Sequence, residues 1–156
     1  MMRGWIDFCW RAVLVVAYRG LRAYWFVVRP ETQGVYVAVW VRGNLLVIRN
    51  SYRSGISLPG GAVDRGEGVA GAAARELSEE VGIEVEVATL RFAKTYVVNH
   101  EYHHDHVSFF EIEMEQEPVV SIDRREVVWA GFRGAEDVKC DEIVTPLRLY
   151  LEDRLR

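Results

Sequence analysis

Apolar residues dominate two runs that flank a short turn, at residues 35–41 and 45–49. Valine and other aliphatic or aromatic residues make up most of both runs, and the residues between them include glycine and asparagine. β-Branched and aromatic residues favour strands, and a short glycine-bearing connection between two such runs is typical of a β-hairpin. The pattern therefore predicts a hairpin over residues 35–49.

Further along the chain, the apolar residues take on the spacing of a helix. Ala70, Ala74, Leu77 and Val81 have the spacing of one buried helical face, which predicts a helix over 69–81 that Gly82 ends. Five glycines in residues 50–68 predict a long loop before this helix. Later runs predict strands at 83–98, 106–114 and 126–132, and a final helix at 145–156. This order favours a mixed α+β arrangement rather than a regular βαβ series.

The first 28 residues predict an amphipathic helix outside this arrangement. On a helical wheel its charged residues (Arg3, Asp7, Arg11, Arg19 and Arg22) fall within an arc of roughly 160°, and the rest is almost wholly apolar. The apolar stretch is short for a membrane span and lacks a clear signal-peptide cleavage site. We expect the helix to pack on the domain or on a second subunit, which would give a homodimer. A membrane-surface helix is the alternative, and we expect it less.

Composition narrows the class of protein. The chain has 156 residues and a net charge of -4, which suits one globular domain and gives no general attraction to duplex nucleic acid or anionic lipid. Cys9 and Cys140 match no disulfide or zinc spacing, so we expect both to be reduced and buried in a cytoplasmic protein. The predicted domains are a helix at 1–28 and a globular domain at 29–156.

An acidic cluster lies within the predicted helix. Glu76, Glu79 and Glu80 crowd one side of it, at spacings where like charges destabilise a helix by up to about 0.5 kcal/mol per pair. Arg75 is placed to orient Glu79, but no lysine lies among the glutamates. Carboxylate oxygens are the ligands that Mg²⁺ and Mn²⁺ prefer. The cluster therefore predicts a divalent cation site.

The residues around this cluster resemble a known family. From Gly61 to Ile83 the chain matches G-x5-E-x7-R-E-U-x-E-E-x-G-U, with U aliphatic, at every position. This pattern is the signature of the Nudix hydrolases, which include the MutT-like enzymes. The resemblance implies the Nudix fold, a mixed β-sheet between helices, here with an extra N-terminal helix.

The resemblance also implies an activity. Water would attack a phosphorus atom in a nucleoside diphosphate linked to another moiety, with Mg²⁺ or Mn²⁺ bound. Glu76 and Glu80 would be ligands, Glu79 a further ligand or the base, and the Gly60 carbonyl an extra ligand. Family members often recruit a later acidic residue. Glu126 is our first candidate and Asp123 the second.

Residues that contact the substrate are harder to predict. Arg49 or Arg53 would bind a phosphate, and Tyr52 would stack on a base; an ordinary exposed loop is the alternative. Four histidines lie within 100–106, and we favour a polar hairpin tip at the cleft rim over a metal site there.

The substrate itself stays open. The chain has no proline between Pro59 and Pro118, whereas family members that act on ADP-ribose or reduced dinucleotides tend to carry one shortly after the signature. Nucleoside triphosphates and dinucleoside polyphosphates are slightly favoured. The alternative function is a non-catalytic, nucleotide-binding regulatory module on the same fold.

Overall fold

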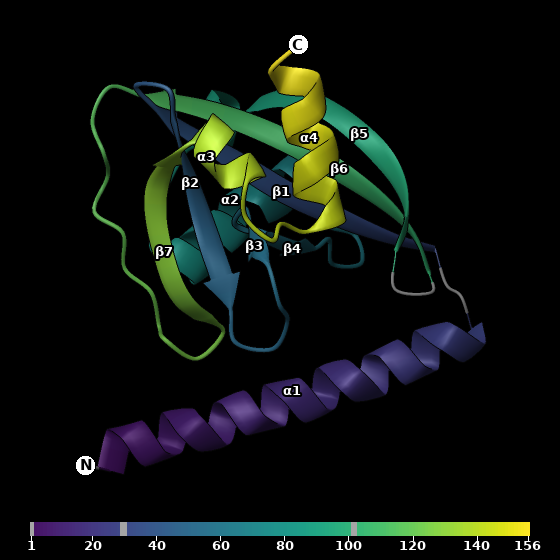
Figure 1. The fold of residues 1–156 in the computed structure, drawn as a ribbon. Coiled ribbons are helices and arrows are strands. Elements are labelled where there is room, and N and C mark those ends of the chain that lie inside the picture. Colours follow the sequence, from purple (N-terminus) through teal and green to yellow (C-terminus); the bar gives the residue numbers. More distant parts are fainter. Residues whose placement is uncertain (1, 29–30, 101–102) are drawn as a thin grey trace.

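The chain folds around one mixed β-sheet (Figure 1). The structure, a computed structural model, describes residues 2–28, 31–100 and 103–156. The elements, in chain order, are α1 (Met2–Val28), β1 (Glu31–Val41), β2 (Asn44–Asn50), β3 (Ile56–Ser57), β4 (Gly60–Ala62), α2 (Val69–Val81), the 3₁₀ turn η1 (Val87–Thr89), β5 (Arg91–His100), β6 (His103–Met114), β7 (Val127–Gly134), α3 (Ala135–Lys139) and α4 (Thr145–Arg154).

The sheet is built around β1. Its order is β3-β2-β1-β6-β5, with β4 added to β1 and β7 added to β2. β1 runs parallel to β6, and every other described strand pair is antiparallel. The predicted hairpin is confirmed, because β1 and β2 pair through a turn in which Arg42 (φ 50°) and Gly43 (φ 80°) both have positive φ. Such a turn matches the twist of the two strands.

Helices cover both faces of the sheet. Val35, Val37 and Val39 of β1 pack with Leu77 and neighbouring residues of α2 on one face. The alternate residues of β1, such as Ala38, pack toward α3 and α4 on the other face. In Figure 1, α3 and α4 lie in front of the sheet and α2 lies behind it. The α+β prediction, a sheet between helices, is confirmed.

Several sequence predictions need correction. The strand predicted from residue 83 begins only at Arg91, because residues 82–90 turn away from the helix through η1. Leu77 and Val81 of α2 are buried as predicted, but Ala70 and Ala74 are only partly buried against the same core, and Ala72 and Ala73 are the fully buried alanines. The predicted loop at 50–68 contains the short strands β3 and β4. Cys9 and Cys140 are both exposed, not buried.

The helix α1 follows the sequence prediction in extent, ending at Val28. It lies below the rest of the chain in Figure 1 and reaches across its edge. The described helices include none that is both long and apolar enough to cross a bilayer. The separation of residues 1–28 from a domain at 29–156 stays a prediction.

Candidate active site

Strand β4 and helix α2 place the acidic cluster beside a glycine pair. Gly60 has φ 153°, and a Cβ there would lie 2.0 Å from the Val35 carbonyl oxygen and 2.8 Å from Tyr36 Cα. Because β4 pairs with β1 at this point, only glycine allows the two backbones to come so close. At Gly61 a Cβ would lie 2.6 Å from Glu76 Oε1. The two glycines thus make room for the carboxylates of α2.

Glu80 lies in the interior of the site. Its side chain is almost fully buried, although it belongs to the acidic cluster. Oε2 accepts a hydrogen bond from the Gly60 N–H (2.8 Å), and Oε1 accepts one from Asn50 Nδ2 (3.4 Å). Burial is the main reason that the pKa of Glu80 is raised to about 8; the Gly60 N–H opposes the shift, and the Glu126 and Glu76 carboxylates add to it.

Arg75 connects the loop to the helix. Its guanidinium contacts both oxygens of Glu67 at 3.0 Å, Glu76 Oε1 at 2.8 Å and Glu79 Oε2 at 3.2 Å. It also donates to the Ala62 carbonyl (3.1 Å). Burial raises the pKa of Glu76, and the hydrogen bond from Arg75 opposes that shift. Arg75 therefore fixes where the Glu76 and Glu79 carboxylates lie.

The three predicted ligands on α2 are not equally accessible. The Glu79 side chain is 62% exposed, whereas that of Glu76 is only 14% exposed. Among the later acids, Glu126 acts electrostatically on Glu80 and Glu76. The Asp123 carboxylate instead accepts hydrogen bonds from the backbone N–H groups of residues 125 and 126, at 2.9 and 3.2 Å. Of these two candidates, it is therefore Glu126 that lies near the cluster.

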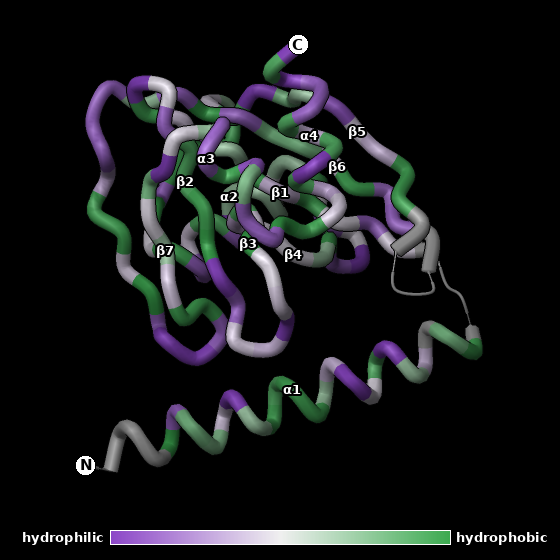
Figure 2. The backbone as a smooth tube through the Cα atoms, viewed as in Figure 1, coloured by the Kyte–Doolittle hydropathy of each residue, from purple (hydrophilic) through white to green (hydrophobic). Residues whose placement is uncertain are grey.

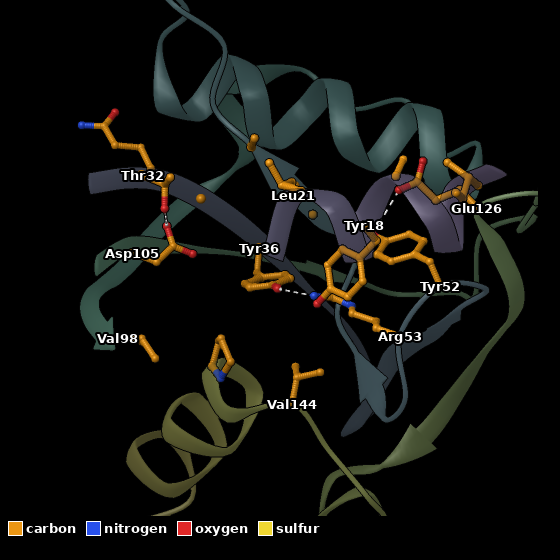
Figure 3. A pocket seen from close by; sticks show the side chains of 18 residues that line it. Tyr18, Leu21, Thr32, Tyr36, Tyr52, Arg53, Val98, Asp105, Glu126 and Val144 are labelled. Atoms are coloured by element: carbon orange, nitrogen blue, oxygen red, sulfur yellow. Dashed lines mark hydrogen bonds between the residues drawn. The ribbon is translucent and has the colours of Figure 1, made fainter. Parts of the chain in front are cut away.

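A cavity of about 380 Å³ adjoins the glycine pair (Figure 3). Gly60, Gly61 and Glu126 form one part of its lining, and Thr32 and Asp105 form another. The wall on the α1 side is mostly apolar and consists of Leu14, Ala17, Tyr18 and Leu21. The cavity therefore extends from the glycine pair beside the acidic cluster to the N-terminal helix.

Two of the three predicted substrate contacts line this cavity. Tyr52 and Arg53 do so, and the Tyr52 hydroxyl donates to Glu126 Oε1 (3.2 Å). The Arg53 guanidinium donates to Tyr36 Oη (3.3 Å) as well as to Asn50 and Ser57. Arg49 does not join them: it is exposed in β2, opposite Ile56 and Trp129. The predicted phosphate contact at Arg49 therefore has no support in its position.

The sequence reasoning missed several residues of the site. The Asn50 amide donates a hydrogen bond to Glu80, and the Tyr36 hydroxyl accepts one from Arg53. Strand alternation offers a signal for Tyr36, since it must point away from the α2 face that Val35 and Val37 occupy. Tyr18 carries a signal too, because this aromatic residue lies on the charged side of the helical wheel. Its ring lies 5.1 Å from that of Tyr52.

The histidine segment is only partly described. His100 and His103 pair across the end of a β5–β6 hairpin, so the predicted hairpin is present. Residues 101–102 lie outside the described residues, as do the side chains of His100, His103 and His104. His106 is exposed. The metal-site alternative therefore falls mostly on side chains outside the described residues.

The chemistry of the acidic cluster fits a divalent cation. Within the described residues, no three carboxylate, imidazole or thiol groups already converge on one point. However, the buried carboxyl of Glu80 is destabilised in its charged form by two neighbouring carboxylates. A hard cation beside these oxygens would remove that repulsion.

Comparisons with known proteins agree with this arrangement. The family model described as "NUDIX domain" matches residues 30–153. The fold resembles the MutT Nudix hydrolase from Burkholderia pseudomallei, at 20% identity and a TM-score of 0.66, with 78% of this chain and 96% of that chain covered.

Two further structures are similar. The Nudix domain of Shewanella oneidensis NrtR, complexed with ADP-ribose, gives a TM-score of 0.69 at 16% identity, with 81% and 89% covered. A bifunctional NMN adenylyltransferase/ADP-ribose pyrophosphatase from Francisella tularensis, complexed with AMP and a Mn ion, gives 0.67 at 20% identity, with 90% and 45% covered.

A comparison of the sequence with curated proteins gives no significant match. The NUDIX match nevertheless spans most of the chain, from the residue before β1 to the last turn of α4. The chain therefore belongs to the Nudix family and is a pyrophosphohydrolase of nucleoside diphosphate derivatives.

Proposed function

We propose that this protein hydrolyses, with Mg²⁺ or Mn²⁺, a diphosphate bond in a small nucleotide-type substrate. Nudix hydrolases generally use a divalent metal ion, and one structural neighbour is complexed with a Mn ion. The observation that carries the proposal is the burial of Glu80 beside Glu76 and the Gly60–Gly61 pair. A buried carboxylate with acidic neighbours is costly unless a cation joins it.

Glu76 and Glu80 would hold the cation, with Glu79, the Gly60 carbonyl and Glu126 as further ligands. When bound, the cation would neutralise charge on the phosphate oxygens and lower the pKa of the attacking water. Glu79, the most exposed of the three glutamates, would act as a ligand or as the base. Arg75 would keep Glu76 and Glu79 in place through its hydrogen bonds.

The cavity supports the assignment of a nucleotide-type substrate. Its volume of about 380 Å³ falls within the usual range of ligand pockets. Tyr52 would stack on the base, and the charge of Arg53 would attract a phosphate. Nucleoside triphosphates and dinucleoside polyphosphates are the substrates that we favour, and we infer that the protein works in the cytoplasm.

A hydrolysis screen tests this function. The full chain with Mg²⁺ should release phosphate or pyrophosphate from at least one of the nucleoside triphosphates, dinucleoside polyphosphates or nucleotide sugars. Glu80→Gln should lower kcat/KM by about 100-fold or more, because the amide loses the charge that holds the cation. Glu115→Gln, at an exposed position after β6, is the matched control and should leave the rate unchanged.

Two outcomes would count against the proposal. An unchanged rate in Glu80→Gln would refute the role of the acidic cluster. Tight nucleotide binding without turnover under any divalent metal would favour the alternative, a non-catalytic regulatory module.

A further inference from the structure

The N-terminal helix turns an uncharged face away from the domain. Seven residues follow one another along this outer face, at steps of three or four, and all are exposed: Ile6, Cys9, Val13, Val16, Gly20, Tyr24 and Val27. With Ala12 and Ala23 they span an arc of about 120° on the wheel, and no charged residue falls within it. Val16 is 70% exposed and Val27 is 79% exposed. A contiguous apolar face of this kind usually marks a binding surface.

The opposite face of α1 makes the contacts with the domain, and several of them are polar. The Arg11 guanidinium donates to the Arg124 carbonyl (2.9 and 2.6 Å), and Asp7 pairs with Arg125 (3.2 Å). Farther along the helix, Tyr18 packs near Tyr52. Packing on the domain therefore accounts for the inner face only. In Figure 2, hydrophobic (green) and hydrophilic (purple) segments alternate along α1.

The charges of α1 differ from those of the rest of the chain. Its sequence has four arginines and one aspartate, whereas the whole chain has a net charge of -4. The single aspartate is already paired with Arg125. Arg19 lies about 20° outside the uncharged arc on the wheel, Arg22 lies farther round on the same side, and both are exposed. Three of the five tryptophans in the chain also belong to α1.

We propose that the outer face of α1 lies on an anionic phospholipid surface. A helix that has an exposed apolar face, exposed arginines to one side of it and three tryptophans in its sequence has the composition of helices that bind at the membrane–water interface. The apolar side chains would enter the boundary of the acyl chains, and Arg19 and Arg22 would reach lipid phosphates. Charge complementarity thus selects anionic lipid.

A second copy of the chain explains these features less well. A paired helix covers a narrow seam, whereas the uncharged arc of α1 is wide. A copy of α1 would also bring arginines but no available carboxylate, because Asp7 is engaged with the domain. Lipid covers a wide face and supplies the negative charge.

The position of α1 would bring the cavity close to the lipid. The inner residues Leu14, Tyr18 and Leu21 line the cavity that reaches Gly60 and Gly61. With its outer face on the lipid and its inner face lining the cavity, α1 would hold the active site near the membrane surface.

Vesicle co-sedimentation tests the proposal. Full-length protein should sediment with vesicles of phosphatidylcholine and phosphatidylglycerol mixed at about 3:1. The fraction that sediments with vesicles of phosphatidylcholine alone should be at least about tenfold smaller. Raising the salt concentration should weaken the binding, because the arginine–phosphate attraction is screened. Equal binding to both kinds of vesicle, or no binding, would overturn the anionic surface.

Matched variants locate the surface. Val16→Asp should lower the fraction bound at least about tenfold without changing the thermal midpoint, because this side chain is exposed. Val119→Asp is the control, since Val119 is 88% exposed on a loop outside α1. Arg19→Glu should weaken binding, and Arg148→Glu on α4 should not.

A separate measurement tests whether a second copy of the chain covers the outer face of α1. Light scattering on the protein without vesicles would show whether Val16→Asp converts a dimer to a monomer. That conversion, together with vesicle binding that Val16→Asp leaves unchanged, would assign the face to a second copy and reject the lipid surface.

Discussion

At the scale of single residues, Gly60 decides how closely β4 approaches β1. The missing side chain lets the Gly60 N–H reach Glu80, so the same position shapes both the sheet and the acidic cluster. The family resemblance drew attention to Gly60 only through its carbonyl, as an extra ligand. It did not reveal that the close neighbour is the backbone at Val35 and Tyr36.

Substitution of Gly60 should therefore be costly. In Gly60→Ala the new Cβ would overlap the Val35 carbonyl oxygen, at 2.0 Å. We expect the free energy of unfolding to fall by roughly 3 kcal/mol or more, measured by urea denaturation. Gly68→Ala is the control, because a Cβ at Gly68 meets nothing within 4 Å and its φ is -76°. Similar losses in both variants would contradict the steric explanation.

The raised pKa of Glu80 predicts how stability depends on pH. In the metal-free protein, the folded state keeps a proton up to about pH 8, whereas the unfolded chain releases it near 4.5. The folded state therefore binds more protons between these values, and this contribution to stability is full below 4.5 and is lost as the pH rises to 8.

Unfolding with urea in EDTA, from pH 5 to 8, measures this effect. The free energy of unfolding of the wild type should fall with pH relative to that of Glu80→Gln, by at most about 1.4 kcal/mol per pH unit. Mg²⁺ should restore stability at pH 8, because it binds the charged carboxylate. Equal pH slopes in the two proteins would refute the assignment.

At the scale of elements, α1 combines two surfaces. Its inner residues line the cavity, and its outer residues are exposed. The positions of charged and apolar residues on a helical wheel predicted the helix, and its C-terminal end agrees with the structure. They did not predict which side meets the domain, because the apolar arc suggested the inner face, whereas Asp7 and Arg11 make the contacts.

A variant at Tyr18 tests the cavity wall. We expect Tyr18→Ala to raise KM for the best nucleotide substrate by about fivefold to tenfold, with little change in kcat, because the ring lies beside Tyr52 in the cavity wall. The thermal midpoint should stay unchanged. Val16→Ala, on the outer face of the same helix, is the control. A loss of kcat alone would place Tyr18 in the chemistry instead.

Other elements show where sequence patterns succeed and fail. The hairpin and α2 were predictable, because Gly43 and Gly82 mark backbone conformations that few residues adopt. Residues 83–90 were misassigned as strand, since alternation in a short segment says nothing about pairing partners. Of the two arginines offered as a phosphate contact, Arg53 lines the cavity and Arg49 is exposed in β2; which arginine reaches the cavity could not be read from spacing alone.

At the scale of the whole molecule, one aromatic group joins the sheet to its front layer. Phe109 of β6 is fully buried and stacks on Tyr150 of α4 at a centroid distance of 5.0 Å. Tyr36 and Tyr96 lie 5.5 Å from it, on β1 and β5. Four elements therefore meet at a single ring.

Loss of this ring should weaken the fold as a unit. Phe109→Ala is expected to lower the free energy of unfolding by about 3–5 kcal/mol in urea denaturation, because it leaves a cavity between the sheet and α4. Phe92→Ala is the matched control: Phe92 is 55% exposed, so its loss should cost about 1 kcal/mol or less. Comparable losses would argue against a central role for Phe109.

The parallel pairing of β1 with β6 has a consequence for how the chain folds. The two residues of each of the eleven pairs, from Glu31–His104 to Val41–Met114, are 73 positions apart in the sequence. Such contacts raise the contact order and slow the search for the native topology. During synthesis β1 can form its hairpin with β2 early, but its other edge must wait for β6 to emerge. That open edge is where a chaperone or a misfolding partner would compete with β6.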